Sequence, residues 1–248
     1  MKRSTLVTLV ILAVLALDQA LKFYIKLHFE YNEDYAILGL DWARLHFVEN
    51  EGMAFGITFG WDYGKLLLSL FRIVMVGALI WYIRHLIALN APTALLVCTG
   101  LITAGALGNI FDSAIYGVIF TESPYHGGLA QFATADMPGY SSFLHGKVVD
   151  MLYFPIQDFD IPEWVPRWGG QNVLFFSWIF NIADAAITCG VLFILLFQRR
   201  FFNETKHSET HTETIAGSEA VIQPHFAGDD SSATDGLAPK TDPAPDYE

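Results

Sequence analysis

Charged residues are scarce in this sequence of 248 residues, at 16% of the total, whereas apolar residues make up 53%. A soluble domain has about a quarter charged residues, so this composition excludes an ordinary water-soluble protein. The apolar residues also cluster in runs of roughly 18 or more, which is long enough to cross a hydrocarbon layer about 30 Å thick. The chain is therefore predicted to be an integral membrane protein.

Cysteine is nearly absent, and Cys98 and Cys189 both lie within apolar runs. Neither has neighbours at a metal-ligand spacing, so both are predicted to be small packing residues. His207 and His211 are spaced i, i+4, but they belong to a polar segment near the end of the chain. The sequence predicts no disulfide and no structural metal.

Large clusters of lysine and arginine are missing too, so nothing in the sequence favours nucleic-acid binding. The net charge of −12 is mostly that of the segment from Glu204 onward, which holds ten acidic and two basic residues. The apolar runs contain no Ser/Lys or Cys/His pair, and the chain has no Walker or GxSxG spacing. These absences argue against P-loop nucleotide binding and against the common covalent hydrolases.

Four apolar runs are predicted to span the membrane, at about 5–25, 66–83, 93–115 and 174–197. The first begins like a secretory signal peptide, but it is too long and lacks a clear cleavage site, so it is predicted to be retained. Residues 1–203 are predicted to form one four-span membrane domain. Residues 204–248 are rich in Ser, Thr, Glu, Asp, Pro and Gly, which predicts a disordered acidic cytoplasmic tail.

Basic residues near the span ends predict the orientation. Lys2, Arg3, Arg84, Arg199 and Arg200 would all lie on one face, which is the cytoplasmic face by the positive-inside rule. Both termini are then cytoplasmic, and two long segments lie outside. Alternating residues at 43–48, with glycine turns after them, predict strands in the first of these segments. The predicted fold class is an all-α integral membrane protein with four transmembrane helices and a small antiparallel β-sheet in the first outer loop.

Ionisable side chains inside the spans carry the functional signal, because each costs about 2.5–3.5 kcal/mol near the bilayer centre. Asp18 and Lys22 are spaced i, i+4 and can form a salt bridge on one helical face.

Two Asn/Asp pairs occur at i, i+3 spacing, Asn109 with Asp112 and Asn181 with Asp184, on spans of opposite direction. They can face one pocket. Hydrogen bonding between helices would be a purely structural use. A third acid, Asp150, favours a functional one.

Two carboxylates in a low-dielectric pocket cannot both ionise cheaply, so one is expected to keep a proton. The charged member can activate water while the protonated member polarises a carbonyl, which is the chemistry of aspartic amide hydrolysis. Two other classes stay open on this reasoning. One is a proton- or ion-coupled transporter that uses Asp18, Asp112 and Asp184 as a relay. The other is a scaffold that recruits partners through its tail.

Five segments resemble the motifs of signal peptidase II, the prolipoprotein signal peptidase family. Residues 18–22 resemble its DQxxK motif, and residues 48–56 resemble NxGxAFG. Residues 104–112 resemble GGALGNxxD, 148–150 resemble VVD, and 180–184 resemble FNxAD, in the family's order.

The resemblance implies a catalytic dyad of Asp150 and Asp184. It implies supporting or substrate-binding roles for seven more residues: Asn50, Gly52, Asn109, Asp112, Asn181, Asp18 and Lys22. The implied reaction removes a signal peptide just before a diacylglyceryl-modified cysteine, with no cofactor and no metal. The implied partners are lipid-modified prolipoproteins and membrane lipid, at the outer face of the bacterial inner membrane.

The chain departs from the family pattern at one position and in two lengths. Ser113 stands where the family usually has an arginine, and Lys147 or Arg72 is expected to replace that charge. The stretches 113–150 and 153–176 are longer than usual, which implies insertions in the second outer segment.

Overall fold

The computed structural model describes residues 2–50, 64–155, 159–160, 162–167, 169–170, 172–173 and 178–198. The helical elements are α1 (Arg3–His28), α2 (Gly64–Ala88), α3 (Thr93–Phe111), the π-helical turn η2 (Asp112–Tyr116), α4 (Gly117–Ile119) and an apolar helix Ile182–Gln198. The strands are β1 (Asp34–Ile37), β2 (Leu40–Asn50), β3 (Val148–Tyr153), β4 (Phe159–Asp160), β5 (Asn172–Val173) and β6 (Ile179–Phe180). The predicted tail at 204–248 lies outside the described residues.

Three helices are long and apolar enough to cross a membrane, namely Arg3–His28, Leu66–Ala88 and Thr93–Ile119. They coincide with three of the predicted runs. The fourth apolar helix is shorter and begins at Ile182, later than the predicted start at 174. Ile179 and Phe180 instead pair with β3 as a strand. A short apolar run has the same hydrophobicity in a strand and in a helix, so composition could not place this boundary.

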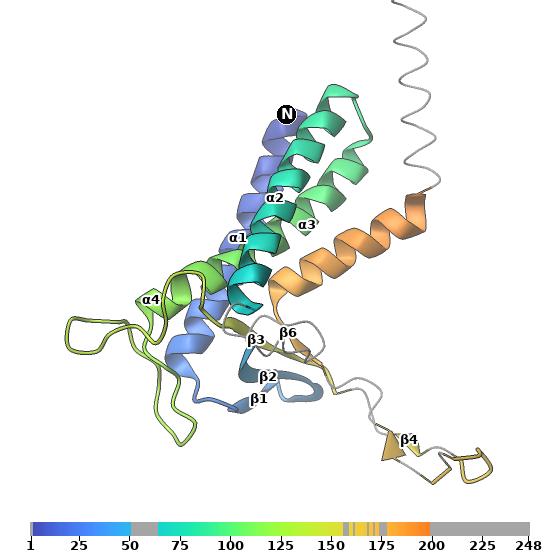
Figure 1. Cartoon of the computed structure of the whole chain (residues 1–248). Helices are drawn as coiled ribbons and strands as arrows, with labels where there is room; N and C mark the ends of the chain where they lie inside the picture. Colours follow the sequence, from blue (N-terminus) through green and yellow to red (C-terminus); the bar gives the residue numbers. More distant parts are fainter. Residues whose placement is uncertain are drawn as a thin grey trace, which may run out of the picture. The chain divides into compact units, whose positions relative to one another are not determined.

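Helix α3 is the central packing element. It runs beside α1 and α2, and the helix Ile182–Gln198 packs on it as well (Figure 1). Glycines allow these approaches: a Cβ on Gly100 would lie 3.3 Å from Val7, and a Cβ on Gly105 would overlap the carbonyl oxygen of Ala183. Small residues at membrane helix contacts let backbones come close and gain dispersion energy.

The close approach at Gly105 predicts that Gly→Ala lowers stability here, whereas the same change raises stability in most helices. Gly→Ala in a helix normally stabilises by up to about 1 kcal/mol, but at Gly105 the added methyl group must push the helix Ile182–Gln198 away. Gly105→Ala is expected to destabilise the protein by about 1–3 kcal/mol. Gly77 on α2 has nothing within 4 Å of such a methyl group and supplies the matched control. Thermal unfolding in detergent should lower the Tm of Gly105→Ala only; equal Tm values would refute the packing.

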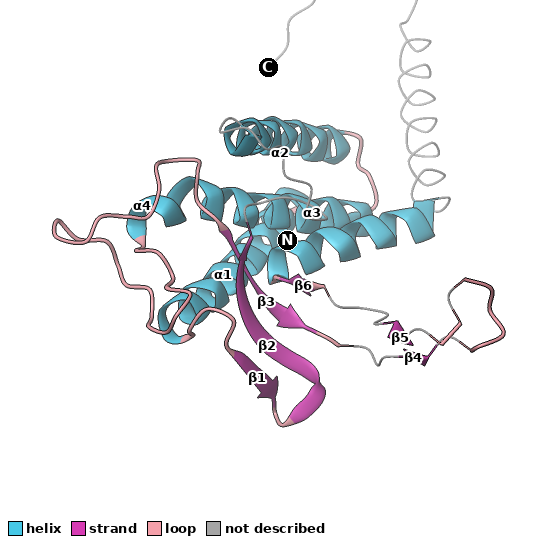
Figure 2. Cartoon of the chain, turned by 60° about the horizontal axis from the view of Figure 1, so that its bottom comes forward, coloured by secondary structure: helices cyan, strands magenta, loops and turns pink. Residues whose placement is uncertain are grey.

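The predicted antiparallel sheet is present and has four strands in the order β1-β2-β3-β6 (Figure 2). Strands β1 and β2 come from the first outer segment, as predicted, whereas β3 and β6 come from the second. The sheet is therefore larger than the prediction, because strand pairs distant in sequence leave no local pattern. In the register of β2 and β3, Val48 lies opposite Asp150 and Asn50 lies opposite Val148. Buried side chains that include Ile25, Phe47, Tyr116 and Met151 join the sheet to the ends of the helices.

Candidate active site

Asn181 directly precedes the helix Ile182–Gln198, and Asp184 lies in the first turn of that helix. The Asn181 side-chain oxygen accepts a hydrogen bond from the backbone N–H of Asp184 at 2.9 Å, which is the geometry of an N-cap residue. Asp18 Oδ1 from α1 accepts the N–H of Ala183 at 2.9 Å. These bonds satisfy two of the free N–H groups at the helix start. They also place Asp184 in the first turn, where the helix dipole favours a negative charge.

Asp150 lies on β3, 3% exposed, and both of its carboxyl oxygens accept hydrogen bonds from amides. Asn181 Nδ2 donates to Oδ1 at 2.7 Å, and Asn50 Nδ2 donates to Oδ2 at 3.3 Å. Burial and the negative charge of Asp184 raise the pKa of Asp150 to about 7. Asn181 therefore links the two acids, one through its side-chain nitrogen and the other through its side-chain oxygen.

Asn109 on α3 is the second connecting amide. Its Nδ2 donates to Asp184 Oδ1 at 2.8 Å, and its Oδ1 accepts from Asn181 Nδ2 at 3.2 Å. The same oxygen accepts a hydrogen bond from Lys22 Nζ at 3.1 Å. The two predicted Asn/Asp pairs thus do meet, and their contact is made through the asparagines.

Lys22 is the centre of a buried ionic cluster beside these acids. Its Nζ lies 2.9 Å from Asp18 Oδ2 and 2.7 Å from Asp112 Oδ2, and all three side chains are at most 1% exposed. The predicted Asp18–Lys22 salt bridge is therefore formed. Asp112 also accepts the backbone N–H of Val149 at 3.4 Å. It belongs to the π-helical turn and faces Lys22, so it lies in a different part of the network from Asp150 and Asp184.

Lys147 or Arg72 was predicted to replace the arginine that the family usually has at position 113. The structure gives these two side chains other partners. Lys147 pairs with Glu122 at 3.1 Å, and Arg72 Nη1 donates to Ser113 Oγ at 3.4 Å. Lys22 supplies the ion pair of Asp112. Arg72 nevertheless brings a positive charge from α2 to position 113 and acts electrostatically on Asp184.

Removing the charge of Lys22 leaves two carboxylates buried without their cation. Breaking a buried ion pair in this way costs about 3–5 kcal/mol, so Lys22→Met is expected to lower stability by that amount. The double variant Lys22→Met with Asp112→Asn removes one of the stranded charges and should recover part of the loss. Denaturant titration in detergent measures both variants. A double variant no more stable than the single one would contradict the ion pairing.

Gln19 and Tyr116 are members of the network that sequence reasoning missed. Gln19 Nε2 donates to Asp112 Oδ1 at 2.9 Å, and its Oε1 accepts from the Tyr116 hydroxyl at 3.0 Å. Gln19 belongs to the DQxxK motif, so the sequence offered a reason to include it. Tyr116 directly follows a predicted span and belongs to no motif, so nothing in the sequence pointed to it. The predicted site residue Gly52 lies outside the described residues.

Metal-ligating side chains do not gather here: within the described ranges, no three His, Cys, Asp or Glu residues are grouped so that they could hold a metal ion. The site consists instead of carboxylates, amides and one lysine. In this arrangement hydrogen bonds through Asn181 and Asn109 connect Asp150 with Asp184.

The sequence matches the family described as signal peptidase (SPase) II over residues 10–200. It is 42% identical to the lipoprotein signal peptidase of Porphyromonas gingivalis over 191 residues, which is 77% of this chain and 81% of that protein. It is 34% identical to the lipoprotein signal peptidase of Amoebophilus asiaticus, covering 86% of each.

A solved structure of a bacterial membrane enzyme, obtained by the in meso method, has a similar fold. Its TM-score is 0.50 at 20% identity, and the match covers 79% of this chain and 88% of that one. The sequence match, the level of identity and the membrane-spanning fold agree: this chain belongs to the signal peptidase II family.

Proposed function

We propose that this chain is an intramembrane aspartic endopeptidase that removes the signal peptide from diacylglyceryl-modified prolipoproteins, just before the lipidated cysteine. The observation that carries the proposal is the position of Asn181, which bonds the Asp150 carboxylate and the backbone of Asp184 at once. Two acids held in one hydrogen-bonded network, Asp150 buried and Asp184 partly buried, suit water activation. The relatives that are lipoprotein signal peptidases support the choice of substrate.

The surroundings of the two acids assign their roles. Asp184 is the charged base. It lies at a helix N-terminus, accepts a hydrogen bond from Asn109 Nδ2 and interacts electrostatically with the positive charge of Arg72. Asp150 holds the shared proton, because its donors are neutral amides and it is buried. Supporting positions are proposed for Asn109 and Asn181 as connectors, Asn50 as a donor, and Lys22 with Asp18 and Asp112 as the ionic anchor.

Hydrolysis then proceeds in two balanced steps. Water attacks the carbonyl carbon, its proton passes to Asp184, and the proton on Asp150 passes to the carbonyl oxygen, giving a neutral diol. The C–N bond then breaks as Asp184 returns its proton to the departing amine nitrogen of the cysteine. A proton of the diol returns to Asp150, which restores the starting state.

The orientation in the membrane is part of the same proposal. Lys2, Arg3 and Arg84 flank the helix ends that lie away from the sheet, so those ends are cytoplasmic. The sheet and the dyad then lie at the outer face. A diacylglyceryl group can stay in that leaflet while the peptide bond before the cysteine reaches the acids.

The proton on Asp150 makes activity sensitive to alkali. With a pKa of about 7, Asp150 keeps its proton below that pH and loses it as the pH rises through 7. If this proton is needed, kcat/KM should fall roughly tenfold per pH unit above about 7. A pH profile of cleavage, with the Tm measured across the same range, separates this loss from unfolding. An activity that still rises at pH 9 would remove Asp150 from the role of acid.

The proposal is tested by incubating the purified full chain in detergent with a diacylglyceryl-modified prolipoprotein. Loss of the signal peptide, seen as a shift to lower mass on a gel, is the expected result. An unchanged precursor, with a known member of the family active in the same assay, would overturn it.

A further inference from the structure

Residues 120–147 form the longer connection that leads from α4 back to β3. Backbone bonds fix this connection against the end of the third span. The backbone N–H of Gly146 donates to the carbonyl oxygen of Ser113 at 2.8 Å, and that of Ser141 donates to the carbonyl oxygen of Gly117 at 2.9 Å. A Cβ on Gly139 would overlap the carbonyl oxygens of this helical segment. The connection therefore has a defined position next to the membrane-spanning helices.

Large apolar side chains of this connection are exposed in the structure. Phe143 is 59% exposed and Phe132 is 52% exposed, and Leu129 and Met137 are each 44% exposed. We call these four residues the apolar rim. Two of the few charged residues in the same segment, Glu122 and Lys147, pair with each other at 3.1 Å. A connection held in a defined position that exposes several large apolar side chains marks an interaction surface.

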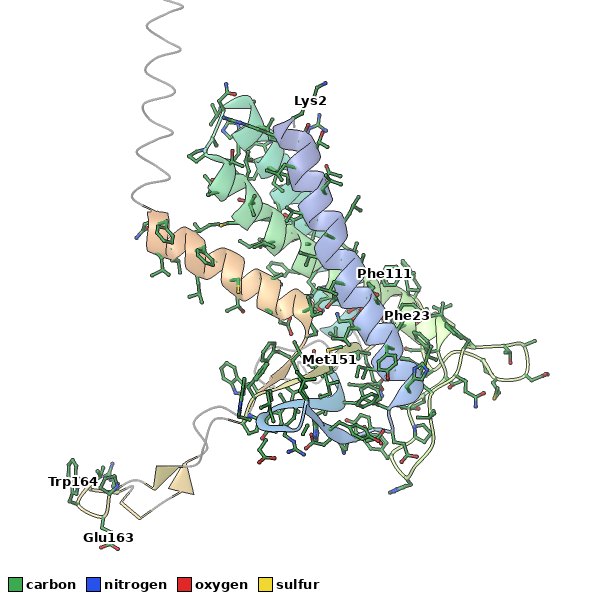
Figure 3. The ribbon with its side chains drawn as sticks, turned by 180° about the vertical axis from the view of Figure 1, so that it is seen from behind. Lys2, Phe23, Phe111, Met151, Glu163 and Trp164 are labelled. Carbon is green, nitrogen blue, oxygen red and sulfur yellow. The ribbon has the colours of Figure 1, made fainter. Side chains whose placement is uncertain are left out.

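The depth of the rim follows from its aromatic contacts. The Phe132 ring lies 5.2 Å from the ring of Phe120 and 6.4 Å from that of Phe23 on α1, and Figure 3 shows Phe23 beside the yellow-green connection. Helix α1 has 26 residues and is roughly 39 Å long. It thus exceeds a hydrocarbon layer of about 30 Å by some 4–5 Å at each end. Phe23 lies five residues before the end at His28, roughly 7–8 Å along the axis, which places it inside the hydrocarbon boundary of an upright helix centred in the bilayer.

The other end of the rim adjoins α2. Ser69 Oγ donates to the carbonyl oxygen of Leu144 at 3.1 Å, which places Phe143 next to the first turns of that helix. On the same turns Leu67 is 67% exposed and Phe71 is 60% exposed, as expected for side chains that face lipid. Leu67 and Phe71 lie on the side of α2 away from Ser69, so Phe143 lies beside a helix whose outer side is apolar and exposed.

We propose that the apolar rim is a membrane anchor, inserted among the lipids of the leaflet at the sheet end of the helices. The four side chains contact the acyl chains and glycerol groups of the lipids in that leaflet. Residues 120–147 then hold the helix end with Asp112 and the start of β3 at a fixed depth. This inference rests on exposure and depth alone, so it stands or falls independently of the peptidase activity.

A fluorescent probe at single cysteines tests the anchor. In the full chain carrying Cys98→Ala and Cys189→Ala, a nitrobenzoxadiazole probe is attached to Phe132→Cys, Phe143→Cys or Leu129→Cys. Asp41→Cys in the sheet is the matched control, since this aspartate is exposed and lies outside the connection. The labelled protein is reconstituted in phosphatidylcholine vesicles with brominated acyl chains, or in ordinary vesicles with iodide in the buffer.

Brominated lipid should quench the three rim probes about threefold more than the Asp41→Cys control, and iodide should show the opposite order. Rim probes quenched by iodide as strongly as Asp41→Cys, and untouched by bromine, would overturn the proposal and indicate a surface that faces water or a protein partner. Three rim positions are used so that the loss of one variant to misfolding leaves two that decide.

Discussion

Asp150→Asn and Asp184→Asn are each expected to lower kcat for signal-peptide removal by about a thousandfold or more. An amide has nearly the shape of the acid, so the network through Asn181 and Asn109 can persist. It cannot, however, supply the charged base or the shared proton. Single-turnover cleavage of a diacylglyceryl-modified precursor measures the loss directly, because substrate binding and product release then do not limit the rate.

Two further variants test whether the loss of activity is confined to Asp150 and Asp184. Asp41→Asn, an exposed change on β2, should leave the rate unchanged. Asp112→Asn should have an intermediate effect, because the Asp112 carboxylate bonds Lys22 and Gln19, whereas the side chains of Asn181 and Asn109 join the proposed dyad. Near-normal turnover in Asp150→Asn or Asp184→Asn would refute the dyad. A loss in Asp112→Asn as large as theirs would move one catalytic role to Asp112.

Removal of the lipid from the substrate is expected to have the second largest effect. A precursor with an unmodified cysteine should be cut at least about a hundredfold more slowly, since a displacement of about 1 Å from the acids can cost that much. The diacylglyceryl group would act as an apolar anchor that sets the depth of the scissile bond. Rates for the two precursors in the same detergent, with the same enzyme preparation, measure the difference.

A third substrate distinguishes anchoring of the substrate by its long acyl chains from simple filling of the space beside the cysteine sulfur. A precursor whose cysteine bears a short alkyl group fills the space beside the sulfur but has no long chains in the lipid, so it should resemble the unmodified precursor. Equal rates for all three substrates would contradict lipid-dependent recognition. They would favour a general intramembrane aspartic protease.

Local patterns in the sequence predicted much of the fold. Apolar runs located three helices of spanning length, because the bilayer demands an unbroken apolar stretch. The i, i+4 spacing of Asp18 and Lys22 predicted their salt bridge, since helix geometry alone brings such residues together. The Asn/Asp spacings likewise predicted that the two pairs could face one pocket, and in the structure Asn109 bonds both Asn181 and Asp184.

Features that depend on distant pairing were not predictable in the same way. The strand at Ile179–Phe180 exists because β3 offers a partner, and nothing in its apolar residues distinguishes it from a helix. The ion pair of Asp112 with Lys22 joins two helices distant in sequence, so no local spacing predicted it. The path of residues 120–147 is set by hydrogen bonds to carbonyls at the end of the third span, a contact that composition does not encode.

The measurement that tests the central claim most directly is the mass of both products after the purified chain acts on a diacylglyceryl-modified prolipoprotein. The proposed chemistry predicts a free signal peptide that ends at the residue before the cysteine, and a mature protein that begins with the lipid-bearing cysteine. Neither product should form with Asp150→Asn or Asp184→Asn. A cut away from the modified cysteine, or the same products from either variant, would contradict an aspartic dyad that acts on a lipid-anchored substrate.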